Sequence, residues 1–259
     1  MPVHPHELHR YAILLDVDGT LLDIAPTPQE VHVPDSLCET LLRIRKRLDG
    51  ALALVSGRPL SDLDHLFAPL RLATIGGHGA EMRLASEGEA VASRAAPLDR
   101  SFREHLKVVA ARHSGIIVED KEYSVALHYR LAPKEGLALV HEVKRACVDW
   151  GDPSIRLLSG KAVVEVKGRG FDKGTGVREL MNHAPFAGRI PIFVGDDITD
   201  EDAFRVVPEF KGLAISVGRK FPGVDGLFQS AAEVRQWLAH LSGDPNVPQI
   251  NGFRIGSTN

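Results

Sequence analysis

The segment Tyr11–Leu15 is an apolar run that leads directly into the sequence Asp-Val-Asp-Gly-Thr. A short apolar run bounded by turn residues is typical of a buried strand. Because side chains two positions apart on an extended backbone share a face, Asp16 and Asp18 can reach toward a common point. Two neighbouring carboxylates repel one another unless a cation or a proton lies between them. The segment therefore predicts a buried strand that ends in a charged site, although a turn in which the carboxylates only cap the next segment is an alternative.

Buried strands alternate with helices in both the first and the last third of the chain. The expected strands after the first lie at residues 51–56, 72–77, 189–197 and 212–218, and the expected helices at about 36–48, 173–182, 201–206 and 231–241, with a short one after Pro59. Such alternation indicates a parallel sheet in an α/β fold. Ligands of these sheets bind at the carboxyl ends of the strands. Asp16, Ser56 and Asp196 all fall at or just past such ends.

The middle of the chain has a different order of elements. Residues 97–167 read as a helix and two strands, followed by a second helix and two more strands. This order predicts a small α+β module with an antiparallel sheet. We therefore expect a Rossmann-like core from residues 1–96 and 168–242, with an α+β cap domain from residues 97–167 inserted into it. The tail at residues 243–259 has weak periodicity, and we expect it to be mobile.

Composition excludes several functional classes. The chain has 259 residues, 44% of them hydrophobic, and its net charge of −3 gives no electrostatic footprint for nucleic acid or an anionic membrane. Its two cysteines lack the spacing of metal ligands and fit a reducing compartment. The first ten residues lack the apolar region of a signal peptide, and no apolar run is long enough to span a bilayer. We expect a cytoplasmic monomer without nucleic-acid or membrane partners.

Four separated pieces of sequence stand at strand ends or helix starts. They are Asp16–Thr20, Ser56–Arg58, Lys173 within "GFDKG", and the acidic segment Gly195–Phe204, "GDDITDEDAF". Together and in this order they resemble the haloacid dehalogenase (HAD) superfamily of phosphatases, which use an aspartate as nucleophile. The resemblance covers the core on both sides of the cap and implies the Rossmann-like parallel-sheet fold with an inserted cap.

The resemblance also implies a phosphoryl transfer. Asp16 would be the nucleophile that forms an aspartyl-phosphate, and Asp18 would protonate the leaving oxygen and then deprotonate the attacking water. Ser56, Gly57 and Lys173 would bind phosphate oxygens, and Lys173 would also offset the charge of the carboxylates.

A metal ion follows from the same resemblance, because an anionic nucleophile must approach a phosphate dianion. Mg²⁺ suits a site made only of oxygen ligands. Its ligands would be the carboxylates of Asp16 and Asp196 and the main-chain oxygen of Asp18. Asp197 and Asp200 are expected to support these ligands, although acids at this position also favour the start of a helix.

A closer resemblance is to the trehalose-6-phosphate phosphatase family. It rests on "GDDITDEDAF", on His78-Gly79, on "ALHYR" at residues 126–130 and on "GKAVVEVKGRGFDKG" from Gly160. It implies that Glu119, Lys121 and Glu165 bind the sugar, since charged groups make strong hydrogen bonds to hydroxyls. Charged pairs of this kind are also common on solvated strands. His128 and Arg130 are not assigned.

The implied function is hydrolysis of trehalose 6-phosphate to trehalose and phosphate, the last step of trehalose biosynthesis, without a fused synthase domain. Another HAD sugar phosphatase, acting on sucrose phosphate or a glycosyl-phosphoglycerate, is an alternative because the core motifs interact only with phosphate. A receiver-like domain that is phosphorylated on aspartate and acts as a binding switch is a third interpretation, although it needs neither a cap nor Asp18 as a proton carrier.

Overall fold

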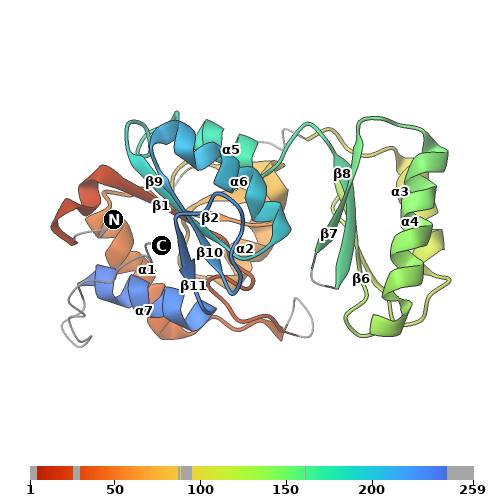
Figure 1. The fold of residues 1–259 in the computed structure, drawn as a ribbon, viewed down its shortest axis with the longest axis horizontal. Coiled ribbons are helices and arrows are strands. Elements are labelled where there is room, and N and C mark those ends of the chain that lie inside the picture. Colours follow the sequence, from red (N-terminus) through yellow and green to blue (C-terminus); the bar gives the residue numbers. More distant parts are fainter. Residues whose placement is uncertain (1–4, 26–29, 87, 89–94, 161, 244–259) are drawn as a thin grey trace. The chain divides into compact units, whose positions relative to one another are not determined.

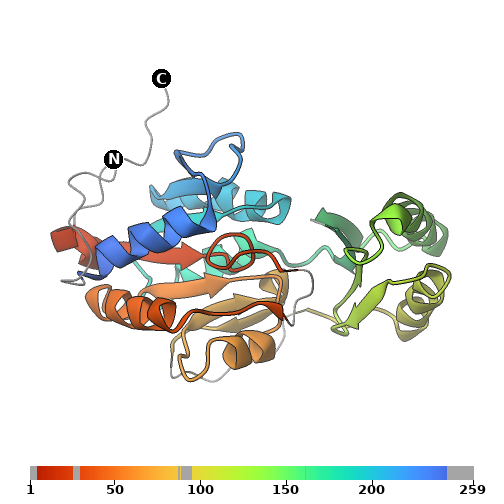
Figure 2. The same ribbon diagram turned by 90° about the horizontal axis from the view of Figure 1, so that it is seen from below.

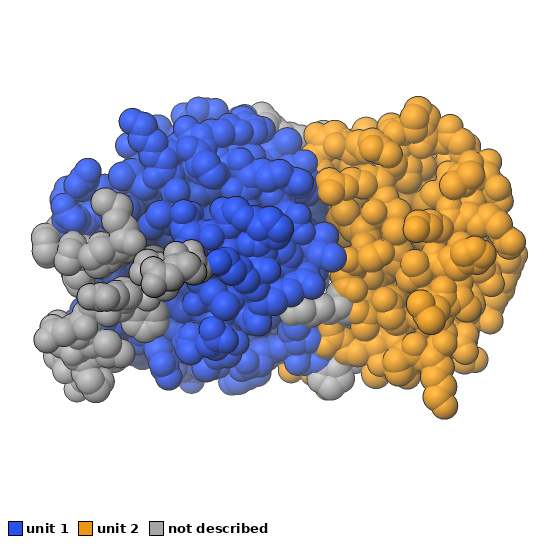
Figure 3. Space-filling view, in the orientation of Figure 1, with its two compact units in different colours: residues 1–25, 31–92, 172–259 blue, residues 26–30, 93–171 orange. Residues whose placement is uncertain are grey.

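The structure is a computed structural model that describes residues 5–25, 30–86, 88, 95–160 and 162–243. The chain divides into two compact units (Figure 3). Unit 1 comprises Met1–Ala25, Val31–Ala92 and Asp172–Asn259, and unit 2 comprises Pro26–Glu30 and Ser93–Phe171. The expected cap, residues 97–167, falls within unit 2. Apart from Gly243, the expected tail lies outside the described residues.

Unit 1 is built on a seven-stranded sheet with the order β11-β10-β9-β1-β2-β3-β4. Strand β1 (Tyr11–Leu15) lies at its centre, parallel to β9 (Ile190–Gly195) on one side and to β2 (Leu52–Val55) on the other. All five residues of β1 are buried, as expected for a strand with apolar side chains on both faces. The remaining strands are β3 (Ala73–Gly76), β4 (Glu81–Arg83), β10 (Leu213–Val217) and β11 (Gly226–Phe228).

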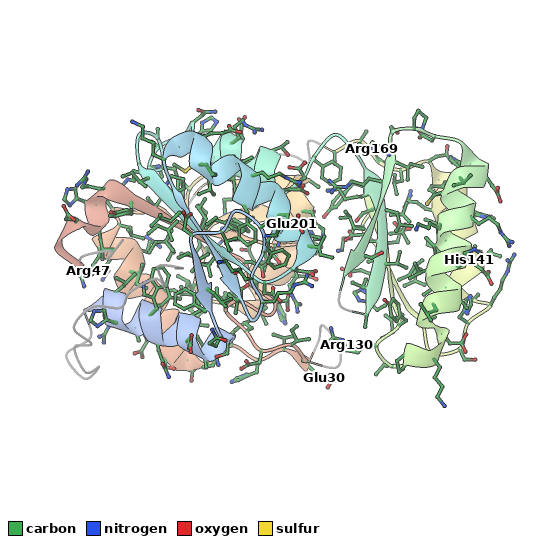
Figure 4. All side chains as sticks on the ribbon, in the orientation of Figure 1. Glu30, Arg47, Arg130, His141, Arg169 and Glu201 are labelled. Carbon is green, nitrogen blue, oxygen red and sulfur yellow. The ribbon has the colours of Figure 1, made fainter. Side chains whose placement is uncertain are left out.

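Helices cover both faces of this sheet (Figure 1). Helices α1 (Asp35–Arg47) and α7 (Ala231–Ser242) lie on one face, with α5 (Lys173–Leu180) and α6 (Glu201–Val206) on the other. Arg47, at the end of α1, donates a hydrogen bond of 2.7 Å to the carbonyl of Leu241 in α7 (Figure 4). The short elements are α2 (Leu60–Leu66) and the 3-10 helices η1 (Pro5–Arg10), η3 (Gly77–Gly79), η5 (Ile198–Asp200) and η6 (Val207–Phe210).

Amphipathic spacing explains why α1 packs on the sheet. Its buried residues Leu37, Leu41 and Ile44 recur every three or four positions, so they form one apolar stripe. Helix α5 begins differently, with a capping box in which Asp172 accepts from the backbone of Thr175 and the Thr175 hydroxyl accepts from the backbone of Asp172. This cap fixes where α5 starts and therefore where Lys173 lies.

Unit 2 has a four-stranded antiparallel sheet with the order β5-β6-β8-β7. Helices α3 (Arg100–Ala110) and α4 (Gly136–Trp150) pack on one face of it, as Figure 2 also shows. Phe102 and Leu106 of α3 contribute to this separate core. The strands are β5 (Ile117–Asp120), β6 (Ser124–His128), β7 (Ile155–Gly160) and β8 (Val163–Gly168), and the 3-10 helix η4 (Pro133–Glu135) precedes α4.

The predicted fold class is confirmed, since the central sheet is mostly parallel and helices cover it on both faces. Two strands were not predicted. Strand β4 pairs antiparallel with β3, and β11 pairs parallel with β10 at the other edge. Both have only three residues, which is too short for a periodic signal. Within the described ranges, no helix has both the length and the apolar composition needed to cross a membrane.

Candidate active site

Three buried carboxylates meet at the carboxyl ends of neighbouring strands in unit 1. Asp16 follows β1, Asp196 follows β9, and Asp200 ends η5 directly afterwards. Their exposed fractions are only 5%, 2% and 0%, and one oxygen from each lies within 4.8 Å of the others. The parallel register of β1 and β9 brings the two strand ends together, because Leu15 pairs with Val194. The predicted convergence of Asp16 and Asp196 is therefore present in the structure.

Lys173 lies among these carboxylates and is itself buried. Its Nζ donates to Asp16 Oδ1 at 2.8 Å and to Asp200 Oδ1 at 2.6 Å. Burial by itself would lower the pKa of Lys173, but the charges of Asp16 and Asp200 outweigh it and raise this pKa above its ordinary value. Lys173 therefore stays an ammonium ion at neutral pH and orients the Asp16 carboxylate.

Asp200 is held by the backbone as well as by Lys173. Its Oδ2 accepts from the N–H groups of Asp196 and Asp197, both at 2.9 Å. Burial raises the pKa of Asp200 to about 7, with Asp16 adding to the effect and Lys173 opposing it. Gly195 permits this arrangement, because a β-carbon there would overlap the Asp200 carboxylate. Since both Asp200 oxygens already accept hydrogen bonds, its geometry fits the predicted supporting role.

The carboxylate of Asp18 points to a different partner. Arg58, which follows β2, donates to both of its oxygens, from Nε at 2.6 Å and from Nη2 at 2.7 Å. Asp18 is 37% exposed at its side chain, whereas Arg58 is 13% exposed. Such a two-bond pairing fixes the position of the carboxylate. Strand alternation predicted that Asp16 and Asp18 reach a common point, but the Asp18 carboxylate pairs with Arg58 instead and lies outside the buried cluster of Asp16, Asp196 and Asp200. The metal role predicted for Asp18 used only its main-chain oxygen.

Glycine at position 19 lets Asp196 approach the Asp18 turn. Gly19 has φ +90, and a β-carbon there would overlap the Asp196 carboxylate. The hydroxyl of Thr20 donates to Asp196 Oδ1 at 3.3 Å. The Asp-Gly-Thr part of the motif therefore holds Asp196 against the turn that carries Asp18.

The turn Ser56–Arg58, which we call the phosphate turn, follows β2. Ser56 is buried, and its Oγ accepts from the N–H of Arg58 at 3.1 Å, as in a local turn formed by serine. The simpler interpretation of Ser56 as a turn residue is thus part of the structure. Because a hydroxyl both accepts and donates, Ser56 can still donate to an anion beside the turn.

The donor set fits a small divalent cation. Asp16, Asp196 and Asp200 offer only carboxylate oxygens, the ligand type that Mg²⁺ prefers. When all three are ionised they carry three negative charges, and Lys173 supplies one positive charge. With all three ionised the cluster would have a charge of −2, which a divalent cation balances; without a cation, the same crowding of charge favours a proton on Asp200, in line with its raised pKa.

A second polar cluster lies in unit 2, on the sheet face opposite α3 and α4. Lys121 Nζ lies 3.6 Å from Glu119 Oε1 and 3.7 Å from Glu165 Oε1, so the structure brings together the three residues expected to bind sugar. Two further residues complete it. Ser124 Oγ donates to Glu165 Oε1 at 2.6 Å, and the ring of His128 lies 3.1 Å from Glu119 Oε2.

Electrostatics favour a charged Glu119 in this cluster. Burial would raise its pKa, but the hydrogen bond with His128 and the charge of Lys121 outweigh that effect and lower the pKa below its ordinary value. An ionised carboxylate accepts hydrogen bonds only, which suits contact with hydroxyl groups.

Comparison with known proteins places the chain in a family. A family model described as trehalose-phosphatase matches residues 14–237. The chain belongs to the trehalose-phosphatase family. This family is part of the HAD superfamily, as the motifs predicted.

Individual relatives agree with this family. The chain is 38% identical over 233 residues to the trehalose-6-phosphate phosphatase of Escherichia coli, covering 90% of this chain and 87% of that protein. It is 40% identical over 238 residues to a probable trehalose-phosphate phosphatase of Sinorhizobium fredii, covering 91% and 89%. The solved C-terminal domain of C. albicans trehalose-6-phosphate phosphatase superposes with a TM-score of 0.80 at 22% identity, over 92% of this chain and 95% of that domain. At that identity the superposition shows the fold.

At least three residues in these clusters were not predicted from the sequence: Arg58, Ser124 and His128. Arg58 stands in the quoted turn but received no role, because nothing in the sequence pairs it with Asp18, 40 positions earlier. Strand alternation could have placed His128, because residues two apart on a strand share a face and His128 therefore lies on the same face as Ala126. Glu119 pairs with Ala126 in the neighbouring strand, and the diagonal reach from there to His128 brings the two side chains into contact.

Proposed function

We propose that this protein is a Mg²⁺-dependent phosphatase that hydrolyses trehalose 6-phosphate to trehalose and phosphate, completing trehalose biosynthesis. The observation that carries the proposal is the buried group of Asp16, Asp196 and Asp200 around the Lys173 ammonium. Membership of the trehalose-phosphatase family supports the substrate and argues against the receiver-like switch. A cytoplasmic location and a monomeric state remain predictions.

The chemistry would begin at Asp16. One of its oxygens attacks phosphorus in line with the leaving sugar oxygen, so the P–O bond to the sugar breaks and an aspartyl-phosphate forms. Lys173, already bonded to Asp16 Oδ1, holds the carboxylate in place and offers positive charge to the phosphate oxygens. Ser56 and Gly57 bind further phosphate oxygens from the phosphate turn.

Asp18 would move the protons. It donates a proton to the departing sugar oxygen and later takes one from the water that hydrolyses the aspartyl-phosphate. Because Arg58 bonds both oxygens of Asp18 in this structure, proton transfer requires that at least one of these bonds opens. Asp18 must therefore take up a proton as a bond to Arg58 opens, before it can act as the acid; the proton that it later takes from the attacking water restores this form for the next turnover.

The residues that would hold Mg²⁺ are Asp16, Asp196 and the main-chain oxygen of Asp18, with Asp200 in support. When bound, the cation neutralises charge on the nucleophile and the phosphate.

The sugar would be bound by Glu119, Lys121 and Glu165 of unit 2, acting as a cap domain. Their carboxylates accept from hydroxyl groups, and the ammonium of Lys121 donates to them. Glu165 is 6% exposed and already accepts from Ser124 at 2.6 Å, so its position is fixed before any sugar arrives. A site that pairs buried polar groups with sugar hydroxyls rejects esters that lack them.

The test compares two substrates in Glu165→Ala. Losing a charged hydrogen bond costs about 1.5–3 kcal/mol, so kcat/KM for trehalose 6-phosphate should fall by about 10- to 150-fold. A small aryl phosphate makes no such contact, and its kcat/KM should change less than about threefold.

Glu104→Ala is the matched control, because Glu104 is an exposed residue on α3, across the sheet from the cluster. It should leave both substrates unchanged. Equal losses on both substrates in Glu165→Ala would remove the sugar-binding role from this residue. If the wild-type protein has a higher kcat/KM for sucrose phosphate or a glycosyl-phosphoglycerate than for trehalose 6-phosphate, the preferred ester is the substrate and the proposal of trehalose 6-phosphate is wrong.

A further inference from the structure

The turn Gly76–Gly79, which we call the glycine turn, connects β3 to β4 and contacts the phosphate turn. The N–H of Gly77 donates to the carbonyl of Arg58 at 2.8 Å, and the N–H of His78 donates to the carbonyl of Ser56 at 3.0 Å. Two positions after this turn, Glu81 of β4 accepts from the N–H of Leu60 at 2.7 Å. The hairpin formed by β3 and β4 therefore holds the phosphate turn by the first two of these hydrogen bonds and the start of α2 by the third.

His78 has an unusual backbone conformation at the centre of this contact. Its φ of 54° and ψ of 34° lie in the left-handed region, which few residues other than glycine adopt. Backbone strain of this kind is found preferentially at functional sites. The surrounding hydrogen bonds and the two flanking glycines keep His78 in this conformation.

The side chain of His78 covers Gly57. A β-carbon placed on Gly57 would overlap the imidazole ring, with Nε2 as the nearest atom and Cε1 at 2.6 Å. Gly57 does not itself have a positive φ, so its backbone would accept alanine. The three atoms nearest to that β-carbon all belong to the imidazole. The ring is therefore what confines the middle residue of the phosphate turn.

The other side of the glycine turn contacts the start of α5. Gly79 has φ +100, and a β-carbon there would overlap the carbonyl oxygen of Asp172, the residue that caps α5. A β-carbon on Gly176, one turn into α5, would lie 3.6 Å from the α-carbon of Gly79. The glycine turn thus lies between the element that carries Ser56 and the element that carries Lys173.

We propose that His78 is a positioning residue for phosphate. Its imidazole fixes the Gly57 peptide, and the glycine turn sets the separation between the phosphate turn and Lys173. His78 acts through Gly57 and takes no proton and no bond from the substrate. The inference rests on the phosphatase activity of the proposed function, but it concerns phosphate and is independent of which sugar is attached.

The deciding experiment is a double-mutant cycle of Gly57→Ala and His78→Ala, with kcat and KM measured for trehalose 6-phosphate and for an aryl phosphate. Misplacing the phosphate turn should cost about 10- to 100-fold in kcat/KM for Gly57→Ala alone. With the imidazole removed, the added methyl group has room, so the same change should cost less than about threefold. His78→Ala alone should affect both substrates alike and weaken inhibition by inorganic phosphate.

A matched pair of variants separates positioning from folding. His78→Asn keeps a residue that tolerates the left-handed region but shortens the side chain. Lys211→Asn likewise places asparagine at a left-handed position, since the exposed residue Lys211 follows η6 with a φ of 58°. Both should keep a thermal midpoint close to that of the wild type. Only His78→Asn should raise the inhibition constant of inorganic phosphate.

Several outcomes would overturn the inference. If Gly57→Ala lowers kcat/KM equally in the wild-type protein and in the His78→Ala variant, the imidazole does not confine Gly57. Losses limited to the sugar phosphate would make His78 a sugar contact. Unchanged phosphate inhibition in His78→Asn would leave only a structural role. A wild-type protein inactive on both esters would refute the proposed function, whereas an active wild type and a His78→Asn variant with the same activity and the same phosphate inhibition would refute this inference alone.

Discussion

At the scale of single residues, the active-site cluster depends on one buried lysine. Lys173 is 3% exposed and bonds two carboxylates that would otherwise be buried without a counter-charge nearby. Removing one partner of a buried ion pair is costly because the remaining charge stays out of water. The cluster is therefore held in place before a metal or a phosphate binds, which is the condition for electrostatic stabilisation of a transition state.

Asp16→Asn tests the nucleophile. The amide keeps the size of the side chain but loses the negative charge required for attack, so phosphate release should fall by at least about 10³-fold. Asp200 remains to pair with Lys173, so the thermal midpoint should stay within a few degrees of the wild type. Asp23→Asn, at a 77% exposed side chain in the same unit, is the control and should retain activity. Phosphate release near the wild-type rate in Asp16→Asn would exclude Asp16 as the nucleophile.

At the scale of elements, helix α3 is tied to the neighbouring strand β5 through Asp120. Arg103 and Lys107, one turn apart on α3, lie 3.0 Å and 2.8 Å from its carboxylate. Burial by itself would raise the pKa of Asp120, but the bonds from Lys107, from the N–H of Glu122 and from Arg103 outweigh it and lower this pKa below its ordinary value. A carboxylate with a lowered pKa stabilises the fold only while it is ionised.

The lowered pKa of Asp120 determines how the stability of the fold depends on pH. The contribution of Asp120 is fully present above the ordinary carboxyl pKa and disappears as pH falls through the lowered value in the folded state. Asp120→Asn should thus be less stable than the wild type at neutral pH, and the gap should shrink as pH falls from about 5 to about 3. Urea unfolding at several pH values measures the gap. Asp149→Asn, at an exposed position on α4, should show no such trend, and a gap for Asp120→Asn that is independent of pH would contradict the argument.

Elements also show what sequence reasoning can reach. Strand β1 and the strands beside it were predicted because their residues are apolar on both faces. A continuous apolar run of this kind can be recognised in one sequence alone. The site followed from them, since Asp16, Ser56 and Asp196 were expected at their ends. The pairings of Arg58 with Asp18 and of His128 with Glu119 were not predicted. They depend on which strands become neighbours and in what register, and these properties are set by the packing of the whole sheet.

At the scale of the whole molecule, the proposed chemistry and the proposed sugar recognition belong to different units. The carboxylates and Lys173 are in unit 1, and the cluster of Glu119, Lys121 and Glu165 is in unit 2. Each unit has its own hydrophobic core. This division is the reason that the ratio between two substrates, rather than a single rate, distinguishes the two roles.

Removal of the metal tests the whole assembly. Chelation should stop phosphate release and Mg²⁺ should restore it, while Ca²⁺, which accepts longer bonds and more ligands, should inhibit. A ligand that binds only the folded protein also raises its stability, so Mg²⁺ should increase the thermal midpoint of the wild type. Asp196→Asn should lose this increase because one proposed ligand is gone. Full activity after exhaustive chelation would rule out the metal.

Because β1 lies between β9 and β2, the central part of the sheet in unit 1 can be completed only late in translation. Asp16 and Lys173 are 157 residues apart, and β9, one of the two neighbours of β1, is made later still. During translation, β1 therefore cannot pair with β9 until after the contiguous segment Ser93–Phe171 has been made. This segment has its own core. Translation thus finishes the part proposed to recognise sugar before the part proposed to cleave phosphate, so we expect a nascent chain that stops before β9 to have no phosphatase activity.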